Sequence, residues 1–228
     1  MQPYLFPYIG YFQLMNAVDK FVIYDDVNYI NRGWINRNRI LSNGKAHMIT
    51  IPLIGASQNK LINGITIIQD PLFFSKLLRS VSESYKKAPY YSEIFPLIEE
   101  ILLCKESNLS EFIHFSLIKI KEYLGIPALI VKSSSIYNNE ELKAQNRILD
   151  ICKKENALHY INPIGGKDIY NQELFENNSI ELSFIKTNEI VYSQFKNDFV
   201  PGLSILDILM FNSVEQTKRL LLKYQLIK

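Results

Sequence analysis

The chain has 228 residues, of which 47% are hydrophobic and 21% are charged, a composition typical of a globular protein. Its formal net charge of +2 gives no strong field, which argues against nucleic acid or an anionic membrane surface as the partner. No run of about 18 apolar residues occurs, so no membrane span is predicted. Cys104 and Cys152 fall in separate helix-like segments, which favours free thiols and a cytoplasmic location.

The first segment, MQPYLFPYIGYFQLM, is broken by Pro3 and Pro7 and lacks the basic start of a secretion signal. We interpret it as part of the mature fold, a proline-bounded turn that leads into a helix over residues 8–19. The run KFVIYDDV, residues 20–27, is typical of a buried strand that ends in two acids.

Strand and helix patterns alternate along the rest of the chain, after a polar segment at residues 28–43. Strands are expected at residues 47–54, 62–70, 127–136, 159–166 and 180–185. Helices are expected at residues 70–87, 90–103, 109–124, 139–157, 203–211 and 215–224. Asp70 is the expected N-cap before Pro71, and Gly125 is the expected stop of the third helix in this block.

The order of these elements predicts an α/β fold. Strands and helices alternate in the second half, which favours a mostly parallel, helix-flanked, Rossmann-like sheet. The helices of residues 71–124 are expected to form an insertion or cap on that sheet. No repeat, low-complexity tract or linker divides the chain, so residues 1–228 are expected to form one domain.

Several ordered motifs resemble the WbqC-like protein family. They are MQPYLFPYIGYFQLM, DKFVIYDDVNYINRGWINRNRI, NRILDICKKENALHYINPIGGKDIY and PGLSILDILMFN. Members usually carry a few more residues before the first motif, so the strand before Pro3 is expected to be short here. The resemblance implies a cytoplasmic modifier of bacterial O-antigen or other surface-polysaccharide building blocks, which transfers glycine or another small acyl group to a sugar. It supplies no established catalytic residues.

The opening is also similar in plan to the nucleotidyl transferases with a HIGH signature, in which strand, turn, helix and strand follow one another. Tyr8-Ile9-Gly10-Tyr11 stands where those enzymes have His-x-Gly-His. Gly10 would allow close approach of a ligand, and the helix N-terminus would face an anion. Tyrosine carries no positive charge toward a phosphate, so a rigid aromatic turn is the alternative. The candidate ligand contacts here are Gln2, Tyr8, Gly10 and Tyr11.

Asp25 and Asp26 end the strand of residues 20–27, and open α/β sheets bind ligands beyond the carboxyl ends of their strands. The pair would act as a base toward an amine or hold Mg²⁺, and solvated turn formers are the alternative. His159 precedes a glycine turn and is a second candidate base. The histidines are scattered without zinc spacing, so no other metal site is predicted and the cofactor stays open.

The segment from Asn28 to Arg39 concentrates side chains that recognise phosphorylated sugars. Arginine supplies a planar fork for phosphate, asparagine pairs with hydroxyl groups, and the single tryptophan would stack on a ring. A half-buried strand with its polar residues outward is the alternative. The candidate contacts are Arg32, Trp34, Asn36, Arg37, Asn38 and Arg39.

The stretch Tyr160–Lys167 runs into a Gly-Gly turn whose backbone N–H groups would cradle an anion, although it lacks the established phosphate-loop spacings. An ordinary strand-to-helix connection is the alternative. The candidate contacts are Asn162, Gly165, Gly166 and Lys167.

Asp207 stands in an apolar helix-like run, LSILDILMF, where an unpaired carboxylate would be costly. We expect an arginine, Arg37 or Arg39, as its partner, with a role in the pocket as the alternative.

These features support three hypotheses. The first is a transferase that adds a small acyl or aminoacyl group to an amino sugar, with Asp25, Asp26 or His159 as base and the glycine turn or Arg37 as oxyanion donor. The second is a relative of the nucleotidyl transferases, and the third is a non-catalytic binder or scaffold. The expected partner is a small molecule, a nucleotide-sugar, and the sequence makes no prediction of the oligomeric state.

Overall fold

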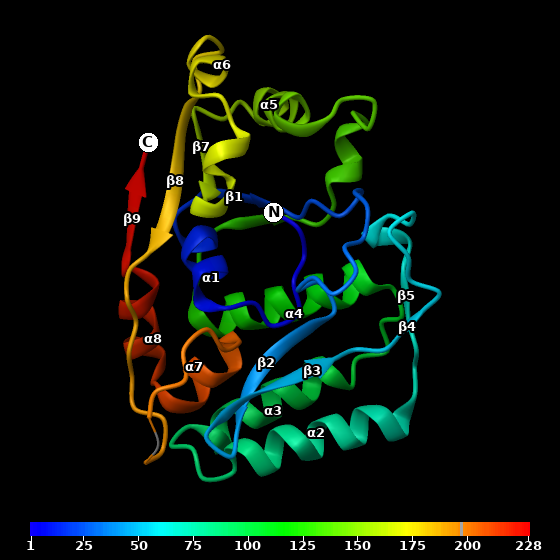
Figure 1. Cartoon of the computed structure of the whole chain (residues 1–228), viewed down its shortest axis with the longest axis vertical. Helices are drawn as coiled ribbons and strands as arrows, with labels where there is room; N and C mark the ends of the chain where they lie inside the picture. The colour runs from blue at the N-terminus through cyan, green and yellow to red at the C-terminus, as the bar shows by residue number, and fades with distance from the viewer. Residues whose placement is uncertain (197) are drawn as a thin grey trace.

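The chain forms helices and short strands, and the computed structural model describes residues 1–196 and 198–228. The α-helices are α1 (Ile9–Asn16), α2 (Pro71–Tyr85), α3 (Tyr91–Leu102), α4 (Leu109–Leu124), α5 (Ala144–Lys154), α6 (Gln172–Glu176), α7 (Ile205–Phe211) and α8 (Val214–Leu221). The strands are β1 (Lys20–Val22), β2 (Arg37–Ser42), β3 (Lys45–Thr50), β4 (Leu53–Ile54), β5 (Thr66–Ile67), β6 (Leu129–Val131), β7 (His159–Pro163), β8 (Glu181–Thr187) and β9 (Tyr224–Ile227). Short 3₁₀ helices are η1 (Ile62–Gly64), η2 (Ser134–Tyr137) and η3 (Ile164–Ile169). Figure 1 shows α5 and α6 at one end of the molecule and α2 and α3 at the opposite end.

The strands form small sheets of mixed direction. β1 pairs parallel with β6, and β7 pairs parallel with β8, whereas β9 runs antiparallel to β8. The pairs β2–β3 and β4–β5 are antiparallel. The α/β class is therefore confirmed, but the predicted continuous, mostly parallel Rossmann-like sheet is not what the described residues form.

A cavity lies between the parallel pair β1–β6 and the parallel pair β7–β8. Residues of both β1 and β7 line a space of about 470 Å³, to which Met1 and Tyr24 also contribute. Within the described part of the chain, β1 and β7 belong to different sheets. The strands β1 and β7 thus line a common cavity and share no ladder of hydrogen bonds.

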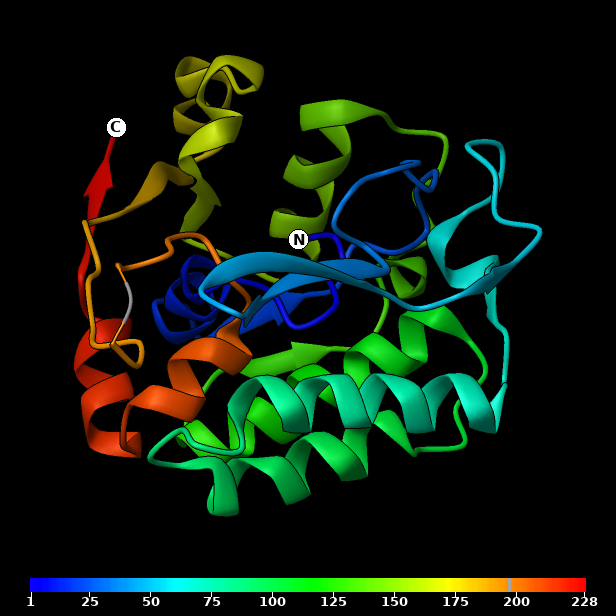
Figure 2. The same cartoon turned by 60° about the horizontal axis from the view of Figure 1, so that its bottom comes forward.

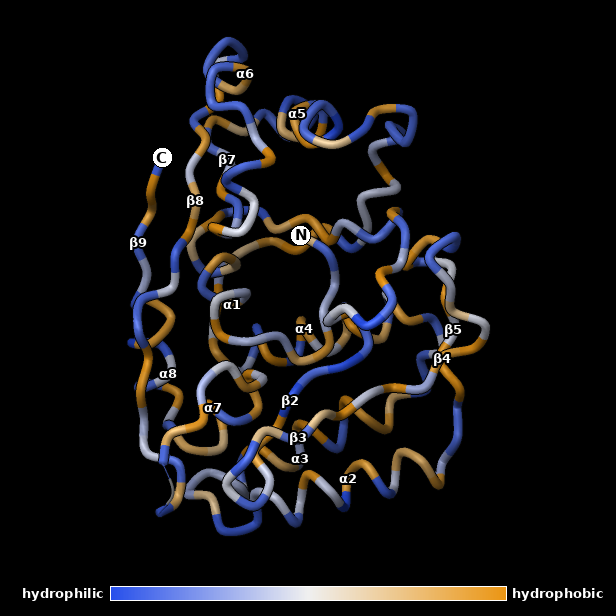
Figure 3. The backbone as a smooth tube through the Cα atoms, in the orientation of Figure 1, coloured by the Kyte–Doolittle hydropathy of each residue, from blue (hydrophilic) through white to orange (hydrophobic). Residues whose placement is uncertain are grey.

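The helical block agrees with its predicted boundaries. Asp70 caps α2 by accepting a hydrogen bond from the backbone N–H two residues later at 2.9 Å, and Pro71 is the first helical residue. Gly125 ends α4 with a φ of 65°, in the region that favours glycine. Hydrophobic and hydrophilic positions alternate along α2 in Figure 3, as expected for a helix with one face packed on the core. The expectation that residues 71–124 are an insertion within a single domain stays a prediction.

Several segments differ from the predicted elements. The strand predicted at residues 62–70 is limited to β5, which follows η1, and the strand predicted at residues 127–136 is limited to β6, which is followed by η2. The end of the polar segment forms the hairpin β2–β3 through Asn43 and Gly44, which have φ values of 50° and 71°. Figure 2 shows this hairpin beside α2, where the backbone N–H of Leu41 donates to the Tyr85 hydroxyl at 2.8 Å. The predicted last helix ends at Leu221, and the residues after it form β9. No helix in the described ranges is long and apolar enough to cross a bilayer.

The chain starts in a strand-like position beside β1. The Met1 amino group donates to the carbonyl oxygen of Val22 at 2.7 Å, and the Met1 carbonyl accepts from the Tyr24 N–H at 2.9 Å. Met1 thus bonds to the residues on either side of Ile23, which is the hydrogen-bond pattern of a parallel strand pair. The start is thus a short strand position, followed by a turn and α1, in the order that the sequence predicts.

Asn38 holds the turn that follows. Its side-chain amide donates to the carbonyl oxygens of Leu5 and Phe6, each at 2.9 Å. Phe6 has a φ of 42°, which is unfavourable for a side-chain-bearing residue directly before Pro7. Because Asn38 is 5% exposed, water does not compensate these carbonyl groups if the amide is lost. Asn38 therefore stabilises the strained turn at Leu5 and Phe6.

Replacing Asn38 by aspartate is expected to lower the free energy of unfolding by about 3 kcal/mol at neutral pH, because a carboxylate cannot donate to two buried carbonyl oxygens. Urea denaturation measures the change. The exposed Asn59 provides the control, since Asn59→Asp makes the same chemical change in a solvated loop. Equal stability changes in the two variants would contradict this role of Asn38.

Candidate functional site

The two predicted carboxylates lie at the carboxyl end of a parallel strand pair. The register of β1 and β6 places Val22 opposite Val131, and each chain continues past its strand into polar residues. Asp25 and Asp26 follow β1, and the run Ser133–Ser135 follows β6. Because adjacent parallel strands end at the same edge, these polar residues meet there.

Asp25 is surrounded by serine hydroxyl groups. Its Oδ1 accepts a hydrogen bond from the Ser133 hydroxyl, and its Oδ2 accepts one from the Ser110 hydroxyl, each at 2.6 Å. The backbone N–H of Asp25 donates to Ser134 Oγ at 3.3 Å. Asp25 is 2% exposed, so these groups replace the water that its carboxylate loses on burial.

Asp26 forms a buried ion pair with Arg147 of α5. Arg147 Nη2 donates to Asp26 Oδ2, and the Ser134 hydroxyl donates to Asp26 Oδ1. The guanidinium lies 5.0 Å from the centre of the Tyr24 ring, and its Nε donates to Asn139 Oδ1 at 2.9 Å. The charge of Asp26 is thus neutralised and its side chain is fixed, which suits a positioning role better than proton transfer.

We refer to the six residues of this network as the aspartate–serine cluster. Its members are Asp25, Asp26, Ser110, Ser133, Ser134 and Arg147. All four carboxylate oxygens accept hydrogen bonds from protein groups, and Arg147 already balances one of the two charges. This arrangement does not fit the predicted alternative of a Mg²⁺ site, which needs carboxylate oxygens directed at the ion.

Ser133 and His114 are the more accessible groups beside the buried Asp25. Both are half-buried, and His114 lies one turn after Ser110 on the same face of α4. Burial lowers the pKa of the His114 imidazole, with the carboxylates of Glu111 and Asp25 opposing that effect. The ring is therefore mostly neutral at pH 7. The Ser133 Oγ atom also shares a hydrogen bond with the Ser135 hydroxyl at 2.8 Å and accepts one from the Ser135 N–H at 3.2 Å, so this half-buried side chain joins Asp25 to the start of η2.

The candidate contacts between Asn28 and Arg39 have mostly structural partners. Asn36 is buried, accepts from the Tyr29 hydroxyl at 2.7 Å and donates to the carbonyl oxygen of Ile51 at 2.7 Å. Arg37 donates to the carbonyl oxygens of Gly33 and Arg32 within its own loop. These bonds close the loop and leave Arg37 less suited to act as an oxyanion donor.

Trp34 stays accessible at the surface. Its side chain is 41% exposed, and the guanidinium of Arg39 lies 5.3 Å from its ring centre. Arg39 also donates to the carbonyl oxygen of Gly202 at 2.8 Å, which ties β2 to the segment before α7. The predicted stacking role of Trp34 stays a prediction, with Arg39 as its present ring partner.

Two of the three candidate glycines are closely approached by the protein's own side chains. A Cβ on Gly10 would lie 2.4 Å from atoms of the Tyr8 ring, and a Cβ on Gly166 would lie 2.0 Å from the amide nitrogen of Asn162. The close approach that these glycines allow is thus used by Tyr8 and Asn162. Gly165 has open space around it.

The remaining predicted contacts lie apart from the cluster. Tyr11 is buried and donates to the carbonyl oxygen of Gln2 at 3.0 Å. Lys167 donates to the carbonyl oxygen of Lys228 at 2.8 Å. His159 is exposed, shares a hydrogen bond with the Ser183 hydroxyl at 2.9 Å and begins β7. His159 therefore lies at the amino end of β7, whereas a base was expected at the carboxyl ends of the strands.

A second buried carboxylate, Asp207, has partners other than the predicted arginine. It accepts hydrogen bonds from the Tyr85 hydroxyl at 2.9 Å, the Tyr192 hydroxyl at 2.5 Å and the Gln194 amide at 2.6 Å. The prediction that Arg37 or Arg39 pairs with Asp207 was wrong, because neutral hydroxyl and amide groups donate the hydrogen bonds that the carboxylate needs. Burial raises the pKa of Asp207, and these hydrogen bonds oppose the rise.

This raised pKa gives a pH-dependent contribution to stability. The folded state binds a proton on Asp207 more readily than the unfolded state does, so stability falls as pH rises from about 3.9 through the folded pKa. We expect Asp207→Asn to remove that contribution. The difference in urea-unfolding free energy between wild type and variant should therefore favour wild type more at pH 4 than at pH 8. A difference independent of pH would contradict the assignment.

Comparison of the sequence with known proteins identifies its family. A profile of the WbqC-like protein family matches residues 2–219. The chain belongs to the WbqC-like protein family. An uncharacterized protein of Mycobacterium tuberculosis (strain ATCC 25618 / H37Rv), Rv1507c, is 30% identical over 207 residues, which cover 89% of this chain and 88% of that protein. No solved structure shows significant similarity to the chain.

Most of the partners that define the aspartate–serine cluster were not predicted. Arg147, Ser110 and Ser133 lie 121, 85 and 108 residues from the carboxylates they contact. The three consecutive serines after the strand of residues 129–131 were the available signal, since they follow a parallel strand as Asp25 and Asp26 do. This WbqC-like protein thus assembles the cluster from segments that are far apart in sequence.

Proposed function

We propose that this WbqC-like protein transfers a small acyl or aminoacyl group to the amine of an amino sugar used in bacterial surface polysaccharides. The observation that carries the proposal is Asp25, a buried carboxylate whose hydrogen-bonded Ser133 hydroxyl leads toward the surface. Acyl transfer to an amine needs a group that accepts a proton as the nitrogen attacks. Membership of the WbqC-like family supports a role in sugar modification through the resemblance described above.

The proposed step uses Ser133 as a relay. The amine nitrogen attacks the acyl carbonyl carbon, and the bond between that carbon and the donor's leaving group breaks. The nitrogen passes a proton to Ser133 Oγ while the Ser133 hydroxyl proton passes to Asp25 Oδ1, 2.6 Å away. Asp25 then returns a proton through Ser133 to the departing thiolate or phosphate, which restores the carboxylate. Ser110 and the Asp26–Arg147 pair position Asp25 and its neighbouring loop. The donor enters as an activated acyl compound, such as a thioester or an acyl phosphate.

A thermal-shift panel tests the substrate class. Nucleotide-linked amino sugars are compared with the matching sugars that carry a hydroxyl in place of the amine. A ligand at a hundredfold its Kd stabilises a protein by about 2.7 kcal/mol, which is roughly 5–10 °C for a chain of this size. We expect the larger shift with the amino sugars. Equal shifts for both sugars would contradict amine recognition.

A further inference from the structure

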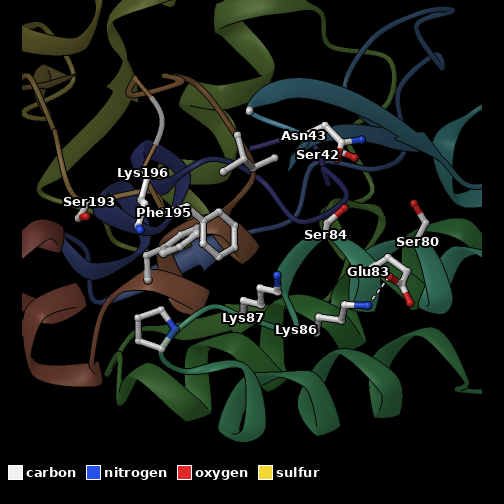
Figure 4. A pocket seen from close by; sticks show the side chains of 14 residues that line it. Ser42, Asn43, Ser80, Glu83, Ser84, Lys86, Lys87, Ser193, Phe195 and Lys196 are labelled. Carbon is white, nitrogen blue, oxygen red and sulfur yellow. Dashed lines mark hydrogen bonds and ion pairs between the residues drawn. The ribbon is translucent and has the colours of Figure 1, made fainter.

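A second hollow, in addition to the cavity between β1 and β7, lies away from the aspartate–serine cluster. It has a volume of about 1030 Å³, at the upper end of the usual range for small-molecule sites, and shares no residue with the cluster. Its walls come from the β2–β3 turn, the end of α2, the loop around Phe195 and the end of α7. Figure 4 shows these walls around a common space.

Positive charge faces this cavity from two walls. Lys86 and Lys87 come from the end of α2, and Lys196 comes from the loop on the other side. Glu83 pairs with Lys86 at 2.5 Å. Among the described residues, no carboxylate lies within ion-pair distance of Lys87 or Lys196. In Figure 4 the amino group of Lys87 points up into the space below Phe195, and Lys196 points into it from the opposite wall.

An exposed aromatic ring, Phe195, lies next to Lys196 on the same wall of the cavity. Phe195 is 37% exposed and has a φ of 45°, a backbone conformation that is unfavourable for a phenylalanine. Its ring is 4.7 Å from that of Phe211 at an interplanar angle of 87°, so Phe211 supports it edge to face. The strained backbone and the supporting ring hold an apolar surface at the cavity rather than in the core.

Hydrogen-bonding groups complete the lining. The hydroxyl groups and the amide around the two lysines belong to Ser42, Asn43, Ser80, Ser84 and Ser193. Such groups pair with the hydroxyl groups of a sugar ring. The ammonium groups would bind phosphates, the exposed ring would stack on a flat base, and the hydroxyl groups would pair with a ribose.

We propose that this cavity binds a nucleoside diphosphate, with the diphosphate between Lys87 and Lys196 and the base against Phe195. Two ammonium groups without a carboxylate partner, together with several hydroxyl groups, favour a phosphorylated polar ligand over an apolar one. The proposal goes beyond the acyl transfer proposed for the aspartate–serine cluster and does not rest on it.

Isothermal titration calorimetry with UDP, ADP and inorganic pyrophosphate tests this site. We expect Lys87→Glu and Lys196→Glu each to weaken the binding of all three probes at least tenfold, because each variant replaces attraction by repulsion. Lys76→Glu is the matched control, since it makes the same charge change on an exposed position of α2 outside the cavity. Raising the salt concentration from about 0.05 M to 0.5 M should weaken binding in the wild type, as expected for ammonium–phosphate contacts.

A second variant separates the base from the phosphates. Phe195→Ala is expected to weaken UDP and ADP at least fivefold and to leave pyrophosphate unchanged. The proposal is overturned if none of the probes binds at millimolar concentration, or if Lys76→Glu weakens binding as much as Lys87→Glu. Asp25→Asn should bind the probes as wild type does, so failure at this cavity and failure of the proposed acyl transfer remain distinguishable.

Discussion

Replacing Arg147 by methionine is expected to lower the free energy of unfolding by about 3–5 kcal/mol, the largest stability effect of any single change considered for this protein. Arg147 and Asp26 have side chains that are 4% and 3% exposed, so the loss leaves a carboxylate buried without its counter-charge. Arg147 also donates to Asn139 at 2.9 Å, and that bond disappears as well. Urea denaturation at pH 7 measures the change.

Two further variants show whether the ion pair is the cause. Adding Asp26→Asn to Arg147→Met removes the unpaired charge, so the double variant is expected to be more stable than Arg147→Met alone. Lys153→Met also replaces a cation by methionine on the same helix, at an exposed position, and is expected to leave stability nearly unchanged. A double variant no more stable than Arg147→Met would contradict an unpaired charge as the origin of the effect.

Asp25→Asn is expected to lower the rate of acyl transfer by about 10²- to 10⁴-fold, because an amide cannot accept the proton that Ser133 relays. The fold should survive the change. The hydroxyl groups of Ser110 and Ser133 donate to a carboxylate in the wild type, and each can rotate to donate to or accept from an amide. The measurement is the initial rate of acylated product, together with the urea-unfolding midpoint of the same sample.

The controls for this variant separate chemistry from structure. Ser133→Ala removes the relay and should also lower the rate, while Asp19→Asn changes an exposed carboxylate at the start of β1 and should not. Loss of activity in Asp25→Asn that follows a matching loss of stability would assign a structural role to Asp25. Full activity in Asp25→Asn would remove it from the reaction.

Local signals predicted the elements whose causes are local. Asp70, Pro71 and Gly125 act within a turn of the helix ends that they mark, and the structure places those ends where they were expected. Asn43-Gly44 is an equally local hairpin signal, but it ends a polar segment that was interpreted as ligand contacts. The hairpin β2–β3 was missed for that reason rather than for lack of information.

Long-range pairing accounts for what the sequence could not predict. The sequence predicted the strand end at Asp25 and Asp26. It did not predict that Asp25 would bond to Ser110 of α4, or that Asp26 would pair with Arg147 of α5. Likewise, Asp207 was recognised as an unusual buried charge, but Tyr85 and Tyr192 approach it only in the folded chain. Side-chain pairs of this kind have no spacing rule that a single sequence would display.

The most direct test of the account is mass spectrometry of a nucleotide-linked amino sugar incubated with the wild-type protein and an activated acyl donor. The account predicts a product heavier by the acyl group less one hydrogen, formed with many turnovers and lost in Asp25→Asn. An unmodified sugar with every acyl and aminoacyl donor, in the presence of demonstrated sugar binding, would contradict catalysis and leave a binding role for the protein.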